Sequence, residues 1–247
     1  MKILFAGPSL CGVPSTCESE ADIERRGPAS QGDITRAVLE GATAIGLVDG
    51  RFGDIAAVWH KEILFALEQG VQVFGAASMG ALRAAECAPF GMIGGGAVFE
   101  RYKSGDLVDD AAVALLHAPA EMDYMPLTEA LVNVEATIRI LVDANLISNT
   151  EGKLLDRTAR TLFFGDRTYH RLTEEVGVPR DRRTELSSLL RTLRRDVKRE
   201  DAIALVAELG RTPEIRMPRT LWRTEPTYTW METLRRTQAS VPPAEAA

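Results

Sequence analysis

The stretch Val71-Gln-Val-Phe-Gly-Ala-Ala-Ser-Met-Gly-Ala-Leu-Arg-Ala-Ala-Glu86 predicts a buried strand, a tight turn and a helix in direct succession. Its first residues are mainly β-branched or aromatic, whereas the alanines and the leucine after the turn favour a helix. Ser78 lies at the break, among small residues. A serine at such a junction is typical of a nucleophile elbow, in which the hydroxyl stands above the sheet and the N–H groups of the helix start form an anion site. Ala76 stands where that motif usually has its first glycine.

Two roles are open for Ser78. Its hydroxyl either caps the helix by accepting a hydrogen bond from an unpaired N–H, or it acts as a nucleophile. A nucleophile needs a base, and the chain has three histidines, His60, His117 and His170. His170 follows a tyrosine in a helical part of the chain, and we expect it at the surface. His60 and His117 are therefore the candidate bases.

Apolar runs alternate with helical patterns on both sides of this stretch. The alternation predicts an α/β fold class, with a Rossmann-like parallel sheet flanked by helices. Residues 7–32 form a connection that is long enough to be functional or mobile. We expect strands at Lys2 to Ala6, Ala42 to Val48 and Ala111 to Leu116, and helices at Asp33 to Glu40 and Ile55 to Gln69.

From Pro126 onward the pattern is helical only. The spacing of apolar residues predicts helices at Leu127 to Leu146, Thr150 to Phe164, Asp181 to Arg195 and Lys198 to Leu209. Three prolines then break the regular pattern between residues 213 and 226. We therefore expect an α/β core domain at 1–125, a helical region at 126–240 and a disordered tail at 241–247.

The composition argues against several classes of protein. Residues 1–125 carry 9 Lys and Arg against 17 Asp and Glu, whereas residues 126–247 carry 20 against 18. The acidic first half disfavours nucleic acid as a ligand, while the second half could meet an acidic protein or peptide. The sequence contains neither a long apolar run nor a signal peptide, so we expect no membrane association and a cytoplasmic location.

The sequence also lacks the usual signatures of metals and cofactors. Cys11, Cys17 and Cys87 have no paired spacing, and we treat them as free thiols rather than as a disulfide framework or a metal site. The chain contains neither the dinucleotide-binding motif G-x-G-x-x-G nor the nucleoside-triphosphate motif G-x-x-x-x-G-K-[ST]. We therefore expect no metal and no cofactor.

The carboxyl ends of the expected strands carry small, polar or ionisable residues. Ligands of open parallel sheets bind at this edge. Gly7, Ser9 and Asp49 are therefore candidate substrate-binding residues, although Asp49 is more commonly an Asp-Gly turn residue and could also orient a base or bind a metal. The four ends are Gly7-Pro8-Ser9, Asp49-Gly50, Gly75 to Ser78, and His117.

A second group of ionisable residues lies in Trp59-His-Lys-Glu62. Glu62 falls beside the apolar stripe of its helix, where a carboxylate needs a partner. Glu62 either forms a salt bridge or a capping contact, or the group is catalytic, with His60 or Glu62 as the base and Lys61 as a cation. Arg83 on the elbow helix is a candidate anion-binding residue, but it could equally pair with Glu86.

Basic residues cluster in the second half around apolar helix positions. Such a cluster forms either a solvated helix face or a docking surface for an acidic partner. Its members are Arg180, Arg182, Arg183, Arg191, Arg194, Arg195, Lys198 and Arg199.

Several of these motifs, in their order along the chain, resemble the TfuA-like family. The resemblance covers about the first 125 residues. Two details differ, because Arg26-Gly27-Pro28 replaces a proline-rich start and Ala111-Ala112 replaces an acidic residue after the double aspartate. The matching stretches are Phe5-Ala-Gly-Pro-Ser-Leu10, Gly27-Pro-Ala-Ser-Gln-Gly-Asp33, Val48-Asp-Gly50, Val58-Trp-His-Lys-Glu-Ile63, Gly75 to Glu86, Gly91-Met92 and Asp109 to His117.

The resemblance implies partnership with a YcaO-type enzyme, which uses ATP to activate a backbone amide so that sulfur replaces its oxygen. The family is associated with thioamide formation, and its proposed role is sulfur supply, by hydrolysing the thiocarboxylate of a ubiquitin-like carrier protein or by recruiting such a source. In this chemistry Ser78 would attack the substrate or orient water, and His60 or His117 would move the proton. The Met79 and Gly80 N–H groups would receive the developing negative charge.

Three hypotheses follow from the resemblance and the residues. The first is a hydrolase that acts on a carrier-protein thiocarboxylate. The second is a non-catalytic adaptor that binds the YcaO-type enzyme and the sulfur donor, with the precursor peptide as a further possible partner. The third is a serine esterase or amidase unrelated to sulfur.

Overall fold

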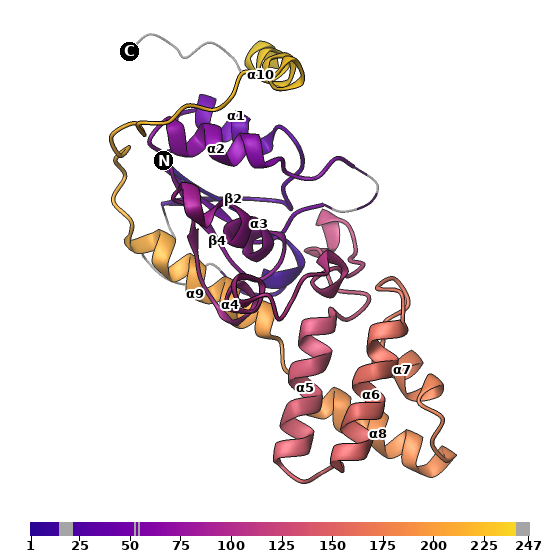
Figure 1. Ribbon diagram of the computed structural model, residues 1–247. Coiled ribbons are helices and arrows are strands. Elements are labelled where there is room, and N and C mark those ends of the chain that lie inside the picture. Colours follow the sequence, from indigo (N-terminus) through magenta and orange to yellow (C-terminus); the bar gives the residue numbers. More distant parts are fainter. Residues whose placement is uncertain (15–21, 52, 54, 241–247) are drawn as a thin grey trace.

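A five-stranded parallel sheet forms the centre of the molecule (Figure 1). The computed structural model describes residues 1–14, 22–51, 53 and 55–240. The strands lie in the order β2-β1-β3-β4-β5, and each neighbouring pair is parallel. This arrangement confirms the α/β fold class. The strands are β1 Lys2–Phe5, β2 Ile23–Arg26, β3 Ala44–Leu47, β4 Gln72–Gly75 and β5 Ile93–Gly94.

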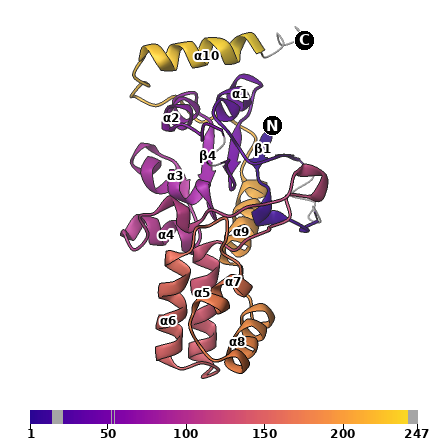
Figure 2. The same ribbon diagram turned by 90° about the vertical axis from the view of Figure 1, so that its right-hand side faces the viewer.

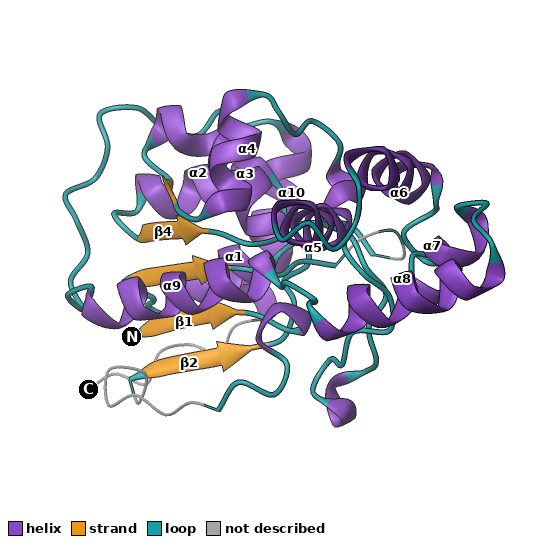
Figure 3. Cartoon of the chain, turned by 90° about the horizontal axis from the view of Figure 1, so that it is seen from below, coloured by secondary structure: helices purple, strands orange, loops and turns teal. Residues whose placement is uncertain are grey.

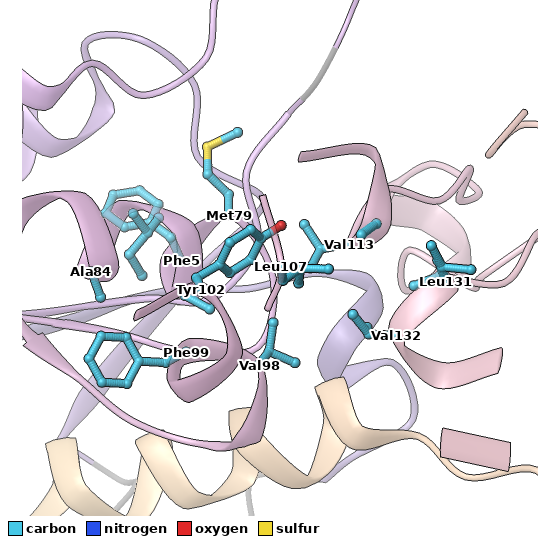
Figure 4. Close-up of a cluster of buried hydrophobic side chains, with 14 of the residues drawn as sticks. Phe5, Met79, Ala84, Val98, Phe99, Tyr102, Leu107, Val113, Leu131 and Val132 are labelled. Carbon is cyan, nitrogen blue, oxygen red and sulfur yellow. The ribbon is translucent and has the colours of Figure 1, made fainter. Parts of the chain in front are cut away.

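The strand expected at Ala111 to Leu116 is wrong. A short 3-10 turn at Asp110–Ala112 stands there instead. Val113 is buried, and it lies between Leu107 and Leu131 in the cluster of apolar side chains drawn in Figure 4. Burial without strand pairing produces the same apolar sequence pattern as a buried strand, so the pattern alone could not separate the two.

The apolar pattern of the sequence does not predict the two edge strands, β2 and β5. β2 lies inside the connection at 7–32, and its sequence Ile-Glu-Arg-Arg is mostly polar because an edge strand pairs on one side only. β5 has two residues, Ile93 and Gly94, which is too short for any alternation to be visible. The sheet is therefore wider than the apolar runs of the sequence indicate.

Helices cover both faces of the sheet (Figure 3). One face, with Ile3 and Phe5, packs in the main core with α1, α2 and α3. The opposite face, with Leu4 and Phe74, packs against Leu205 and other apolar residues of α9. Because successive side chains of a strand point to opposite faces, β1 supplies both cores. These helices are α1 Asp33–Leu39, α2 His60–Glu68, α3 Met79–Cys87 and α9 Val197–Arg211, and α4 Ala97–Ser104 packs against α3 and α9.

Four helices form a bundle beside the carboxyl edge of the sheet (Figures 1 and 2). The helical character expected after Pro126 is confirmed. The boundary at residue 126 stays a prediction, and α9, which lies beyond it, packs on the sheet rather than in the bundle. The bundle helices are α5 Leu131–Asp143, α6 Asn149–Thr161, α7 Tyr169–Glu175 and α8 Arg180–Thr192.

The last helix, α10 Tyr228–Ser240, lies across α1 and α2 at the far end of the molecule (Figure 2). Trp230 is buried against Phe65 of α2, with the two ring centroids 5.6 Å apart. Its residues lie inside the helical region expected at 126–240, but the prolines before it interrupt the pattern and no separate helix is predicted there. Cys17 and the tail expected at 241–247 lie outside the described residues, and Cys11 and Cys87 are free thiols.

None of the helices that the structure describes has the length and apolar character needed to cross a membrane.

Candidate active site

The junction between β4 and α3 forms the tight turn that the sequence predicts. Ala77 has a positive φ of 66°, and the Ser78 N–H donates to the Ala76 carbonyl at 2.8 Å. The turn also needs a small residue at Gly80, because a Cβ there would overlap the carbonyl oxygen of Leu47. The helix therefore starts against the backbone of β3, and Ser78 is placed at the carboxyl edge of the sheet.

Ser78 is 3% exposed, and its hydroxyl makes no capping hydrogen bond to α3. Within the part of the chain that the structure describes, the Ser78 Oγ has no hydrogen-bond partner at all. Although the residue is largely buried, Ser78 Oγ does not belong to the buried atoms that lack a partner, so the oxygen is accessible from the cavity that Ser78 lines. The geometry therefore gives no support to Ser78 as a helix cap.

A cavity of about 730 Å³ opens at this edge of the sheet. Its walls come from the turns after the strands, from the segment 113–121, and from single side chains of later elements. The convergence expected at the strand ends is therefore present, although His117 reaches the cavity from a loop rather than from a strand. The polar and ionisable side chains that line the cavity include Asp49, Arg51, Ser78, His117, Glu121, Tyr124 and Lys198.

Asp49 ties the ends of β1 and β3 together. Its Oδ2 accepts hydrogen bonds from the Gly7 N–H at 2.9 Å and the Ser9 N–H at 3.0 Å, and its Oδ1 accepts one from Ser9 Oγ at 2.7 Å. The two backbone N–H groups are thus already used inside the protein. The expectation that Gly7 and Ser9 bind substrate directly has no support from this arrangement, in which they hold the Asp49 carboxylate.

His117 lines the same cavity as Ser78. Its Nδ1 lies 2.8 Å from the Ala118 carbonyl oxygen, and because a carbonyl can only accept, Nδ1 carries the proton. The other nitrogen, Nε2, is then the basic one. The His117 ring packs against the edge of Tyr124, with centroids 5.6 Å apart, which helps to fix its orientation.

The helix start offers one N–H group rather than two. The Gly80 N–H donates to the Val48 carbonyl at 3.1 Å, so the expectation that it receives negative charge is wrong. The Met79 N–H has no partner among the described residues. Only the Met79 N–H is therefore available to an anion at the start of α3.

Lys198 is the functional candidate that the sequence analysis missed. It belongs to the basic cluster for which the sequence predicts a solvated face or a docking surface, yet it is buried and lines the cavity. Its Nζ donates to the Val113 carbonyl at 2.8 Å and lies 4.0 Å from Asp49 Oδ1. Burial lowers the pKa of Lys198, and the nearby Asp49 opposes that shift. A signal was present, because Lys198 lies on the apolar stripe that continues at Ala202 and Leu205.

The group around His60 lies away from the cavity. The His60 Nε2 is 2.8 Å from a Glu86 carboxylate oxygen, which Arg83 also contacts at 2.7 Å. Lys61 donates to the Glu225 carbonyl at 2.7 Å and so holds the segment before α10. None of these residues lines the cavity that contains Ser78.

Glu62 is fully buried and makes capping contacts, one of the alternatives that the sequence left open. Its carboxylate accepts hydrogen bonds from the N–H groups of Gly32 at 2.8 Å, Trp59 at 3.2 Å and Thr35 at 3.3 Å. Burial raises the pKa of Glu62, and these hydrogen bonds oppose the shift. The contacts also explain why α2 starts at His60, later than the apolar spacing predicts.

Most of the arginine cluster is engaged inside the protein. Arg182 pairs with Glu151 at 2.7 Å, Arg194 with Glu129 at 2.8 Å, and Arg195 with Glu200 at 3.0 Å. These pairs join the bundle helices to one another and to the start of α9. The cluster is therefore less available for docking than its sequence suggests.

Comparison with known families supports the resemblance read from the sequence. Residues 49–168 match the family model of TfuA-like proteins, a region that contains Asp49, Ser78 and His117 but not Lys198. A comparison with curated proteins gave no match. Residues 49–168, which hold the elbow and most of the cavity wall, are therefore similar to TfuA-like proteins.

Proposed function

We propose that this protein supplies sulfur for peptide backbone thioamidation by hydrolysing the thiocarboxylate of a ubiquitin-like carrier protein. At the level of the family, the match supports an accessory role in thioamidation. The observation that carries the hydrolytic step is the Ser78 hydroxyl, which has no partner among the described residues and shares a cavity with His117. A YcaO-type enzyme would then use the released sulfide.

The proposed reaction has two steps. In the first, Ser78 Oγ attacks the thiocarboxylate carbon while its proton passes to His117 Nε2, and the C–S bond breaks as the sulfur leaves with that proton. In the second, water attacks the resulting ester, His117 takes the proton from the water, and the proton returns to Ser78 as the C–O bond breaks. The net reaction converts the thiocarboxylate and water into a carboxylate and hydrogen sulfide. The Met79 N–H lies at the helix start, where the oxyanion would form.

Substrate binding has to complete the site. No hydrogen bond joins Ser78 to His117 in the structure. Hydrogen bonds between catalytic groups often tighten only in the complex with substrate. The same observation favours the second candidate function, a non-catalytic adaptor that holds the carrier for the YcaO-type enzyme.

Reconstituted thioamidation separates these two functions. The reaction would contain the YcaO-type enzyme, ATP, the precursor peptide and thiocarboxylated carrier. If the protein is the hydrolase, Ser78→Ala abolishes the thioamide product, and added inorganic sulfide restores it. If the protein is an adaptor, Ser78→Ala combined with His60→Ala leaves the yield unchanged, and that outcome would refute the hydrolytic proposal.

The base can be assigned with three histidine variants. We expect His117→Gln to slow sulfide release by about a hundredfold or more, the usual contribution of a general base. His60→Gln should leave the rate close to that of the wild type, because His60 contacts Glu86 outside the cavity. His170→Gln is the matched control, since this histidine lies at the surface of α7. A large loss in His60→Gln alone would move the base to His60.

A further inference from the structure

Lys198 is a buried cation whose hydrogen bonds are incomplete. An ammonium group has three N–H donors. One of them donates to the Val113 carbonyl at 2.8 Å. The nearest carboxylate oxygen, Asp49 Oδ1, is 4.0 Å away, which is beyond hydrogen-bond distance. Among the described residues, Lys198 therefore has donors without an acceptor.

Asp49 does not neutralise Lys198 in a close ion pair. Its two oxygens are already held by the Gly7 N–H, the Ser9 N–H and the Ser9 hydroxyl. Three neutral donors thus occupy the carboxylate, and the lysine remains at a distance. Burying a charge is expensive unless it is paired and hydrogen-bonded, so this position calls for a further anionic partner.

The cavity supplies the space for that partner. Lys198 and Ser78 both line it, so a lysine with unused donors and a serine hydroxyl are reached from the same volume. Two carboxylates, Asp49 and Glu121, and two basic residues, Lys198 and Arg51, line the cavity, so its wall carries no excess of either charge. A carboxylate carries one charge and two acceptor atoms, which suits the donors that Lys198 leaves unused.

We propose that Lys198 binds the terminal carboxylate, or thiocarboxylate, of a polypeptide chain end and so presents its carbon to Ser78. The identity of the chain end as substrate rests on the proposed function, whereas the binding of a carboxylate does not. Lys198 lies outside the matched family region, at the start of α9. The helix that covers one face of the sheet thereby completes the site at the sheet edge.

Binding of an unreactive chain-end mimic tests this assignment without any turnover. Acetyl-diglycine and acetyl-diglycine amide differ only in the charge of the end group. Each would be titrated into isotope-labelled protein, and the amide signals of Met79 and Lys198 followed by NMR. We expect saturable shifts with the carboxylate, and binding of the amide that is weaker by about tenfold or more.

Two variants of Lys198 and one matched control complete the experiment. Lys198→Met should remove the preference for the carboxylate, and Lys198→Gln, which keeps a donor for Val113, should do the same. Lys2→Met is the control, because Lys2 is also buried and donates to one carbonyl, that of Gly210 at 2.6 Å, at the opposite edge of the sheet. Urea unfolding would confirm that each variant is folded.

Two results would overturn the assignment. One is a wild-type protein that does not distinguish the carboxylate from the amide, including one that binds neither. The other is a folded Lys198→Gln variant that keeps the preference. A failure of the proposed hydrolysis gives a different pattern, in which the preference for the carboxylate persists while Ser78→Ala releases sulfide as fast as the wild type.

Discussion

The backbone conformation of the turn between β4 and α3 depends on single residues, above all on Ala77. Ala77 adopts a positive φ, which costs an L-residue about 1 kcal/mol or more, and the turn is otherwise held by contacts between backbones. Strain of this kind is common at functional sites, where the surrounding structure enforces it. It directs Ser78 toward the cavity instead of toward the N–H groups of α3. The tightness of the turn could be predicted from the small residues, whereas the orientation of the hydroxyl could not.

Gly80→Ala should destabilise the protein strongly. The new Cβ is attached rigidly to the backbone of α3 and would overlap the backbone carbonyl oxygen of Leu47, so the overlap can be relieved only by separating α3 from β3. We expect a loss of about 3 kcal/mol or more in the free energy of unfolding, measured by urea denaturation. Gly95→Ala is the control, because a Cβ there meets open space. Equal stability of the two variants would contradict the close approach of helix and strand.

At the scale of the elements, the carboxylate of Glu151 stabilises the start of α6. Glu151 accepts hydrogen bonds from Arg182 at 2.7 Å and from the Ser148 N–H at 2.9 Å. These contacts lower the pKa of Glu151 from 4.5 to about 2, with the Arg182 hydrogen bond the largest cause. Because the folded protein has the lower pKa, the stabilisation is present above pH 4.5 and is lost as the pH falls toward 2.

Glu151→Gln therefore has a pH-dependent effect. Above pH 4.5 we expect the substitution to lower the free energy of unfolding by about 1 kcal/mol, the usual contribution of such a cap. The difference from the wild type should shrink as the pH falls from 4.5 toward 2. Urea midpoints at several pH values measure this. Glu175→Gln, which loses only a surface pair with Arg171, should change stability by less than about 0.5 kcal/mol. A Glu151 effect that is constant with pH would refute the explanation.

The sequence pattern predicts elements well where periodicity is long and strong. The three inner strands and the elbow helix, together with most of the bundle, follow from it. Local pattern failed for β2, an edge strand with polar residues, and for the segment at 111–116, which is buried without pairing. Only tertiary packing decides these two cases.

The residues of the site, like the elements, can be predicted only where a local sequence pattern marks them. The turn motif and a strand end are local signals for Ser78 and Asp49, whereas His117 was predicted from a strand that the structure replaces with a 3-10 turn and a loop; all three line one cavity. Lys198 was missed because its role depends on α9 returning to the sheet from the far half of the chain. Its position on an apolar stripe is the available signal, as it is for Glu62.

At the scale of the whole molecule, the site and the C-terminal arm are separate. The cavity is built from residues between Pro8 and Lys198, whereas the segment after residue 212 runs past α2 to α10. Contacts such as those of Lys61 with Glu225 and of Glu68 with the Thr224 N–H fasten this arm. The arm is thus attached to the opposite side of the α/β unit from the bundle (Figure 1).

Trp230→Ala should release α10 without damaging the site. The variant loses the ring contact with Phe65, and amide hydrogen exchange should become faster in residues 228–240. We expect the rate of sulfide release to stay within about twofold of the wild type, because local opening of an arm leaves the rest of the fold intact. A large loss of activity together with normal exchange in α10 would show that Trp230 acts on the site.

The central claim is that the Ser78 hydroxyl carries out the chemistry that frees sulfide. The most direct measurement is the initial rate of sulfide release from purified, thiocarboxylated carrier by the wild type and by Ser78→Ala, with the stability of both checked. We expect the variant to lose about a hundredfold or more of the rate, as for other nucleophile deletions. Release by a folded Ser78→Ala protein at the wild-type rate would contradict the account.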